Sequence, residues 1–284
     1  MSTVKFRDRE WTLGSFPKLM GILNVTPDSF SDGGSPLPLE ERIETLLRDG
    51  ADIIDIGGES TRPGAQEVPL EEELERVLPA VECVRRMCSD VFISIDTRKA
   101  KVAEEAIRLG GDIINDVSGF SFDPELLPVA VKTRAGVIVM HSRSIPELMQ
   151  TGDNLIYEHG VETVAEEIRS ILDRVLAAGI SKDRIIVDPG IGFAKTPELS
   201  QELIGSAEIL LRLGYPLLSA PSRKSFIGKL TGEAVPANRD YGTCGSVIAS
   251  AIRGYALIRV HNVKAAKDCL KVFYGCIGDE SAGK

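Results

Sequence analysis

Eight short apolar runs in this chain end in polar residues of the kinds that bind and activate substrates. In chain order the polar positions are Asn24, residues 57–60, Asp96, Asn115, His141, Asp188, residues 222–224, and Arg259 with His261. Carboxylates and amides can read the N–H and C=O groups of a flat heterocycle, and arginine can grip phosphate oxygens with parallel hydrogen bonds. If these residues converge, they predict a site for a ring that carries an anionic group.

The apolar runs have the length and spacing of buried parallel strands. They cover residues 19–23, 53–56, 91–95, 113–114, 137–140, 185–187, 217–218 and 257–260. Short buried runs that alternate with helical stretches indicate strand–helix units, and eight such units predict an α/β fold of the (β/α)8 TIM barrel type. Polar residues at the carboxyl ends of barrel strands face one common mouth, so we expect a single active site there.

The stretches between the strands support this fold. Residues 70–84 and 161–176 place apolar side chains at intervals of three and four, which predicts helices that lie on a sheet, and Gly179 ends the second one. A late apolar stripe could pack on the barrel or on a second subunit; it consists of Val263, Ala266, Leu270 and Phe273.

Two strand-to-helix loops are longer than the usual two to six residues. They cover residues 25–38 and 57–69, after the first and second strands. Because both would overhang the mouth, we expect them to act as lids or substrate contacts, with Phe30 and Arg62 touching the ligand.

Length and composition bound the protein class. The 284 residues show no compositional break, which predicts one domain: a core of about residues 19–276, an N-terminal extension over residues 1–18 and a disordered tail over residues 277–284. The net charge of -9 argues against nucleic-acid and anionic-membrane partners. With no apolar stretch of membrane-spanning length and no signal-peptide core, we expect a cytoplasmic protein.

Cysteine and histidine usage does not indicate zinc. The five cysteines are scattered, and the three histidines lie far apart in the chain. Taken singly, a strand-end acid or amide such as Asp96, Asn115 or Asp188 could merely cap a helix or start a turn. Capping alone is a weaker explanation for the whole set, because all of these polar residues follow barrel strands and would point into one cup.

Five strings carry a resemblance to a known family. Residues 20–34 read MGILNVTPDSFSDGG and residues 50–65 read GADIIDIGGESTRPGA, and INDVSG, DPGIGF and SRKS follow at residues 114–119, 188–193 and 222–225. In this order they resemble dihydropteroate synthases, from about residue 19 to about residue 263. The resemblance implies a transferase of folate biosynthesis that joins 4-aminobenzoate to 6-hydroxymethyl-7,8-dihydropterin diphosphate and releases 7,8-dihydropteroate and diphosphate.

The resemblance also implies roles for individual residues. The implied pterin contacts are Asp96, Asn115, Met140, Asp188 and Lys224. The implied diphosphate contacts are Asn24, Arg62, Arg259 and His261, with Asn24 as the ligand of a Mg2+ cofactor. The implied aminobenzoate contacts are Phe30, Thr61, Pro63, Phe193, Lys224 and Ser225. The groups closest to the reaction would be Asp96, Lys224, Arg259 and His261. The family usually forms homodimers, and sulfonamides mimic its aminobenzoate substrate.

Three other functions share some of these features. A pterin-binding methyltransferase barrel would use the same cup, although it gives no reason for the residue 61–63 and 222–225 strings. A lyase could use Lys224 as a Schiff-base nucleophile. A non-catalytic pterin-binding barrel would fit every motif. Ala194 stands where the family often has glycine, but neither it nor the altered string before the last strand carries an expected contact.

Overall fold

The computed structural model describes residues 3–26, 37–60, 64–144 and 152–278. Its strands are β1 (Thr3–Phe6), β2 (Arg9–Thr12), β3 (Lys18–Asn24), β4 (Ile53–Gly57), β5 (Phe92–Asp96), β6 (Ile113–Asp116), β7 (Gly136–Met140), β8 (Ile185–Asp188), β9 (Leu218–Ser219) and β10 (Leu257–Val260). Its α-helices are α1 (Leu39–Asp49), α2 (Leu70–Met87), α3 (Ala100–Arg108), α4 (Leu126–Thr133), α5 (Val161–Ala177), α6 (Pro197–Gly205), α7 (Ala207–Leu211), α8 (Ser225–Thr231), α9 (Asp240–Ile252) and α10 (Val263–Cys276).

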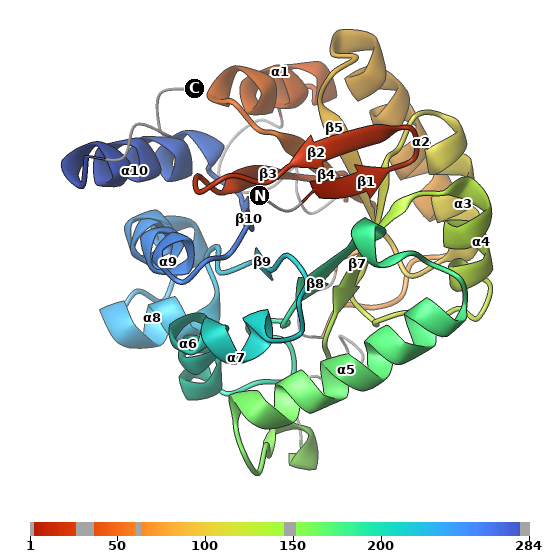
Figure 1. Cartoon of the computed structure of the whole chain (residues 1–284). Coiled ribbons are helices and arrows are strands. Elements are labelled where there is room, and N and C mark those ends of the chain that lie inside the picture. Colours follow the sequence, from red (N-terminus) through yellow and green to blue (C-terminus); the bar gives the residue numbers. More distant parts are fainter. Residues whose placement is uncertain (1–2, 27–36, 61–63, 145–151, 279–284) are drawn as a thin grey trace.

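Eight parallel strands form the predicted barrel. Their hydrogen-bonded order is β8-β7-β6-β5-β4-β3-β10-β9. A parallel bridge between Val187 and Leu217 joins the two ends, and the Val187 N–H donates to the Pro216 carbonyl at 2.9 Å. The helices form a ring outside the strands (Figure 1). The TIM-barrel prediction is therefore confirmed, and each of the eight apolar runs contributes a strand.

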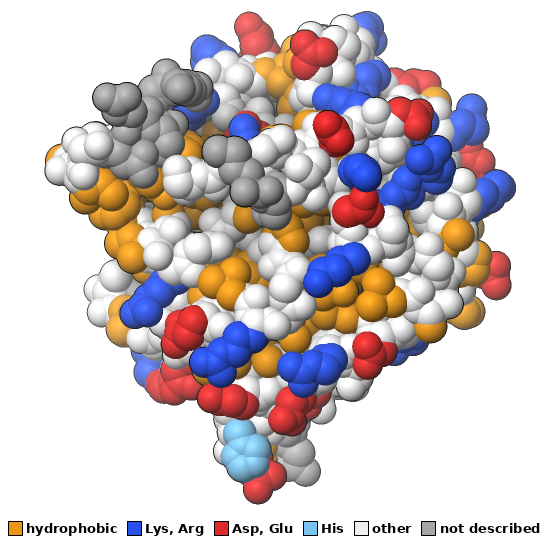
Figure 2. All heavy atoms as spheres, viewed as in Figure 1, with side chains coloured by type: hydrophobic (Ala, Val, Ile, Leu, Met, Phe, Trp, Pro, Cys, Tyr) orange, Lys and Arg blue, Asp and Glu red, His pale blue; other side chains and the backbone are white. Residues whose placement is uncertain are grey.

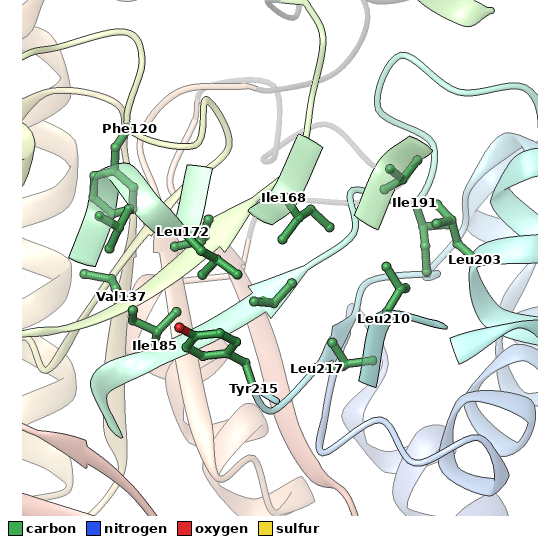
Figure 3. Packing of buried hydrophobic residues seen from close by; sticks show 14 of the residues in the cluster. Phe120, Val137, Ile168, Leu172, Ile185, Ile191, Leu203, Leu210, Tyr215 and Leu217 are labelled. Carbon is green, nitrogen blue, oxygen red and sulfur yellow. The ribbon is translucent and has the colours of Figure 1, made fainter. Parts of the chain in front are cut away.

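The space between strands and helices is filled by aliphatic side chains. On the β7–β8 side, Val137 and Ile185 meet Ile168 and Leu172 of α5 in one buried cluster (Figure 3). The predicted helices at residues 70–84 and 161–176 correspond to α2 and α5. The late apolar stripe, on α10, buries Val263, Ala266 and Leu270 in the core between helices and strands.

The amino ends of the barrel strands are covered by a hairpin that the sequence did not reveal. Strands β1 and β2 pair antiparallel, and the hairpin lies across the near end of the barrel in Figure 1. Its apolar side chains join those of the barrel floor in one cluster; they are Val4, Phe6, Trp11 and Leu13. Gly136 leaves room for Phe6, because a Cβ at residue 136 would lie 2.1 Å from the phenylalanine ring. The hydrophobic core thus extends before the expected start at about residue 19.

Basic and acidic side chains are interspersed on the face that carries the hairpin (Figure 2). This face offers no broad surface of one charge. Among the helices of the described ranges, none combines the length and the apolar composition that crossing a lipid bilayer requires.

Candidate active site

The inward-facing residues change from apolar to polar along each strand. Near the amino ends, Ile53, Ile113, Ile186 and Leu257 belong to the buried cluster under the hairpin. Because side chains alternate across a strand, the next inward positions lie two residues later. They are Asp55, Asn115, Asp188 and Arg259. The barrel therefore has a dry floor and a polar cup at the carboxyl ends of its strands.

Strand register brings four of the expected positions to one level of this cup. Asn24 pairs with Gly57, Gly57 with Asp96, and Asp96 with Asn115. A Cβ on Gly57 would lie 3.6 Å from the Asn24 Oδ1 atom and 3.5 Å from the Asp96 Cβ atom. The bare glycine backbone therefore keeps space open between the amide of Asn24 and the carboxylate of Asp96.

Arg259 links two carboxylates in the cup. Its Nε atom donates to Asp55 Oδ2 at 2.6 Å and its Nη2 atom to Asp96 Oδ2 at 2.7 Å. Asn115 Nδ2 lies 3.3 Å from both Asp55 oxygens. Burial raises the pKa of Asp96 to about 7, although the Arg259 charge opposes the shift. Burial also disfavours the Arg259 charge, but Asp55 and Asp96 outweigh it and raise the guanidinium pKa.

Asp55 is a site residue that the sequence reading missed. It is completely buried and sits inside an otherwise apolar strand, in the register that faces the cup. The sequence did contain a signal for this residue: a carboxylate within an apolar strand indicates a buried partner, because carboxylates are almost never fully buried without one.

Asp188 and Lys224 form the opposite wall of the cup. The Gly190 N–H donates to Asp188 Oδ1 at 2.7 Å, and Lys224 Nζ donates to the Ile191 carbonyl. Burial raises the pKa of Asp188 and lowers that of Lys224 to about 8, while each charge partly offsets the shift of the other. Arg259 and Asp96 also act on the Lys224 charge, which indicates that the two walls share one site.

The other expected contacts lie around these groups. Met140 is buried and pairs in register with Asp188. The Phe193 ring centroid lies 4.5 Å from Lys224 Nζ, and Ser225 is exposed as the first residue of α8. The His261 Nδ1 atom lies 2.9 Å from the Ser222 hydroxyl. Four expected contacts lie outside the described residues: Phe30, Thr61, Arg62 and Pro63.

The donor set fits a magnesium ion that substrate would help to hold. In the part of the chain that the structure describes, no three His, Cys, Asp or Glu side chains cluster as a complete metal cage. Mg2+ commonly keeps several waters and binds through one or two protein oxygens together with substrate phosphates. An amide oxygen such as Asn24 Oδ1, beside the Asp96 carboxylate, fits that role.

Comparisons with known proteins identify the family. A family model described as "Pterin binding enzyme" matches residues 20–261. The dihydropteroate synthase of a Synechocystis strain is 46% identical over 258 residues, which cover 89% of this chain and 88% of that protein. The chain belongs to the dihydropteroate synthase family.

Solved structures of dihydropteroate synthases share the whole architecture. A Xanthomonas albilineans dihydropteroate synthase with 4-aminobenzoic acid has a TM-score of 0.87 and 38% identity, with 97% of this chain and 98% of that chain covered. The enzyme from the same organism in complex with 7,8-dihydropteroate has a TM-score of 0.84 and 35% identity, covering 97% of this chain and 98% of that one. The expected family membership and barrel are thus both confirmed.

Proposed function

We propose that this chain joins 6-hydroxymethyl-7,8-dihydropterin diphosphate to 4-aminobenzoate and releases 7,8-dihydropteroate and diphosphate. One observation carries the proposal: acids, an amide and two cations from separate strands and from the loop after β9 meet in one cup of a dihydropteroate synthase barrel. The relatives that bind 4-aminobenzoic acid and 7,8-dihydropteroate support the same small molecules as partners of this chain.

The pterin ring would occupy the cup between the two walls. The Asp188 carboxylate can accept two parallel N–H bonds from the aminopyrimidine edge of the ring. The Lys224 ammonium can donate to the carbonyl side, and Asn115 can use the remaining hydrogen-bonding capacity of its amide. Met140 would supply an apolar surface for one ring face. These roles fit a flat heterocycle, because its hydrogen-bond donors and acceptors lie along its edges and its two faces are apolar.

The diphosphate would leave toward Asn24, Arg62, Arg259 and His261. Contacts of Arg259 with described residues use the Nε and Nη2 atoms, so further N–H groups of its five can meet phosphate oxygens. Mg2+ bound to Asn24 and the diphosphate would neutralise charge that develops on the leaving group. Preorganised cations stabilise such charge strongly in a site that excludes water.

The chemistry needs no nucleophilic side chain. The C–O bond breaks largely before attack, because the electron-rich dihydropterin can delocalise a cation at its exocyclic methylene and Asp96 can stabilise that cation. The aromatic amine of 4-aminobenzoate then attacks the methylene and forms the C–N bond. The electron pair of the broken bond leaves with the diphosphate, and the new nitrogen loses a proton. Phe193, Lys224 and Ser225, together with Phe30, Thr61 and Pro63, would hold the aminobenzoate for this attack.

The quaternary state and compartment belong to the same proposal. A homodimer is supported by exposed apolar side chains on three neighbouring C-terminal helices; they are Leu230, Tyr241, Ile252 and Val272. A cytoplasmic location is supported by the five cysteines, which are all free.

The decisive test is turnover with defined substrates. The purified chain is mixed with dihydropterin diphosphate, 4-aminobenzoate and Mg2+, and dihydropteroate is measured by chromatography. We expect product that depends on both substrates. Borohydride treatment in the presence of a carbonyl substrate should leave Lys224 unmodified. Absence of product from a folded protein that still binds the pterin would instead favour a non-catalytic barrel.

A further inference from the structure

His141, at the end of β7, has both ring nitrogens engaged by protein groups. The ring is buried, Nε2 lies 2.6 Å from Glu167 Oε2, and Nδ1 lies 3.0 Å from Lys195 Nζ. Because the ionised Glu167 carboxylate can only accept, Nε2 carries the proton that is donated to it, and Nδ1 is left to accept from Lys195. Burial lowers the pKa of Lys195 to about 7, while the Asp188 charge partly opposes that shift. Burial lowers the pKa of His141 to about 4, and the Lys195 charge adds to that shift. His141 is therefore a neutral linker in the protein interior.

Lys195 ties the end of β7 to the loop that follows β8. Its side chain is 2% exposed. Besides His141 Nδ1, the ammonium donates to the His141 carbonyl at 3.1 Å and to the Phe193 carbonyl at 2.9 Å. A Cβ at Gly190 would lie 2.0 Å from the His141 carbonyl oxygen and 3.1 Å from Lys195 Nζ. The three donor protons of the ammonium are thus matched by three acceptors in a closely packed space.

The loop at this point has an unusual backbone that needs such support. Ala194 lies between Phe193 and Lys195 and has a φ of 46°, in the region that favours glycine. Its carbonyl accepts a hydrogen bond from the Tyr157 hydroxyl at 3.0 Å. Strained residues persist only where their surroundings hold them, and they are common at functional sites. Two successive carbonyls are held here by side chains: that of Phe193 by the buried Lys195 and that of Ala194 by the partly buried Tyr157.

The outer end of the network is anchored on a rigid helix. Glu167 belongs to α5 and also accepts from Arg143, whose Nε atom lies 3.0 Å from both carboxylate oxygens. The next residue, Ile168, is completely buried in the cluster shown in Figure 3. A helix held in this way fixes the Glu167 carboxylate, and through it the His141 ring and the Lys195 ammonium.

We propose that Lys195 and His141 are positioning residues that fix the loop from Pro189 to Phe193, and thereby the Phe193 ring against Lys224. The same loop supplies the Ile191 carbonyl that Lys224 contacts. This inference rests on the proposed function, in which Phe193 borders the aminobenzoate. Asp188 lies within β8 and its position is held by strand pairing, so the hydrogen bonds of the network position the aminobenzoate side of the site. The Lys195 charge acts on Asp188 only as one of several charges that lower its pKa.

The proposal predicts unequal effects on the two substrates. Lys195→Met keeps the length of the side chain but removes all three donors. We expect the KM for 4-aminobenzoate to rise about tenfold or more, because small misplacements of substrate-positioning groups have large kinetic effects. The KM for dihydropterin diphosphate should change far less. The matched control is Lys182→Met, since Lys182 is an exposed lysine beside the Tyr215 ring and far from this network.

A pair of substitutions at His141 separates positioning from general packing. In His141→Asn the amide oxygen can take the place of Nδ1 and accept from Lys195, whereas His141→Leu leaves that ammonium proton buried and unpaired. We expect the Asn variant to retain most of the aminobenzoate affinity that the Leu variant loses.

Folding is followed independently by the fluorescence of Trp11, which lies at the opposite end of the barrel. A cooperative melt with an unchanged aminobenzoate KM in Lys195→Met would overturn the proposal. Equal losses for both substrates, or equal losses in the Asn and Leu variants, would show a merely structural role. If the wild-type chain formed no dihydropteroate, the proposed function itself would fail.

Discussion

At the scale of single residues, the buried Asp96 and the partly buried Lys224 set the protonation state of the cup. Burial raises the pKa of Asp96 to about 7 and lowers that of Lys224 to about 8, so both shifts favour the uncharged form of the side chain. The ionised carboxylate and the charged ammonium coexist best in the narrow range between these values. We therefore expect a bell-shaped pH profile of kcat/KM for dihydropterin diphosphate, because that ratio reports ionisations of the free enzyme.

The two limbs of this profile can be assigned by substitution. Asp96→Asn should remove the fall on the acidic side, and Lys224→Arg should remove the fall on the basic side. Above pH 8, the contribution of Lys224 to the free energy of unfolding should rise with pH, whereas kcat/KM should fall. The folded pKa of Lys224 lies below its usual 10.5, so between these values the unfolded chain binds more protons and the Lys224 contribution to stability rises with pH. If the melting temperature fell with pH in parallel with kcat/KM on the basic side, unfolding rather than Lys224 deprotonation would explain the loss of activity, and the assignment would be wrong.

Asp188 provides a second prediction at this scale. Replacing it with asparagine keeps the shape of the side chain but removes the charge and one acceptor that the pterin edge needs. We expect pterin affinity to fall by about a hundredfold or more, since loss of one partner of a buried charge pair typically costs about 3–5 kcal/mol. Calorimetric titration with the pterin measures this loss, and a Trp11 fluorescence melt serves as the folding control. Unchanged affinity would remove Asp188 from the proposed ring contacts.

At the scale of elements, the hairpin of β1 and β2 stabilises the barrel from the end opposite the site. The Phe6 ring is completely buried and packs edge-on against Phe92 with a centroid distance of 5.3 Å. Phe6→Ala should lower the free energy of unfolding by about 3–5 kcal/mol, as for other large aromatic truncations. Both substrate KM values should stay unchanged, because the floor of the barrel separates the hairpin from the cup.

The close contact of Phe6 with Gly136 allows a double-mutant test of this packing. Gly136→Ala alone would place a methyl group 2.1 Å from the Cδ1 atom of Phe6 and should be strongly destabilising. In the Phe6→Ala background the same methyl group would enter the vacated space and cost less, so the two effects should not add. Additive changes in urea denaturation would show that the hairpin does not pack as described.

The strands and the site differ in how far the sequence predicts them. Aliphatic runs with polar ends predicted all eight barrel strands, because burial on both faces leaves a continuous apolar pattern. The hairpin was missed because Lys5, Arg7 and Arg9 make its strands resemble a polar extension. Asp55 and Lys195 were missed because their partners, Arg259 and His141, are distant in sequence. Such pairings depend on tertiary contacts rather than on local pattern.

At the scale of the whole molecule, the three neighbouring helices α8, α9 and α10 expose large apolar side chains. Tyr241 is 94% exposed, Ile252 61% and Val272 66%, on the neighbouring helices α9 and α10. Figure 2 shows hydrophobic side chains at the edge of the molecule where these helices lie in Figure 1. Contiguous exposed apolar surface commonly marks an interface between proteins.

A symmetric dimer through this surface would cover it, because a two-fold interface pairs one patch with its own copy. We expect light scattering after size-exclusion chromatography to give twice the mass of one chain. The double variant Tyr241→Asp with Ile252→Asp should give the mass of one chain, since only like charges would meet at the interface. Leu176→Lys, a change at an exposed apolar site on α5, should leave the dimer intact. A wild-type chain that remains monomeric at high concentration would refute the dimer.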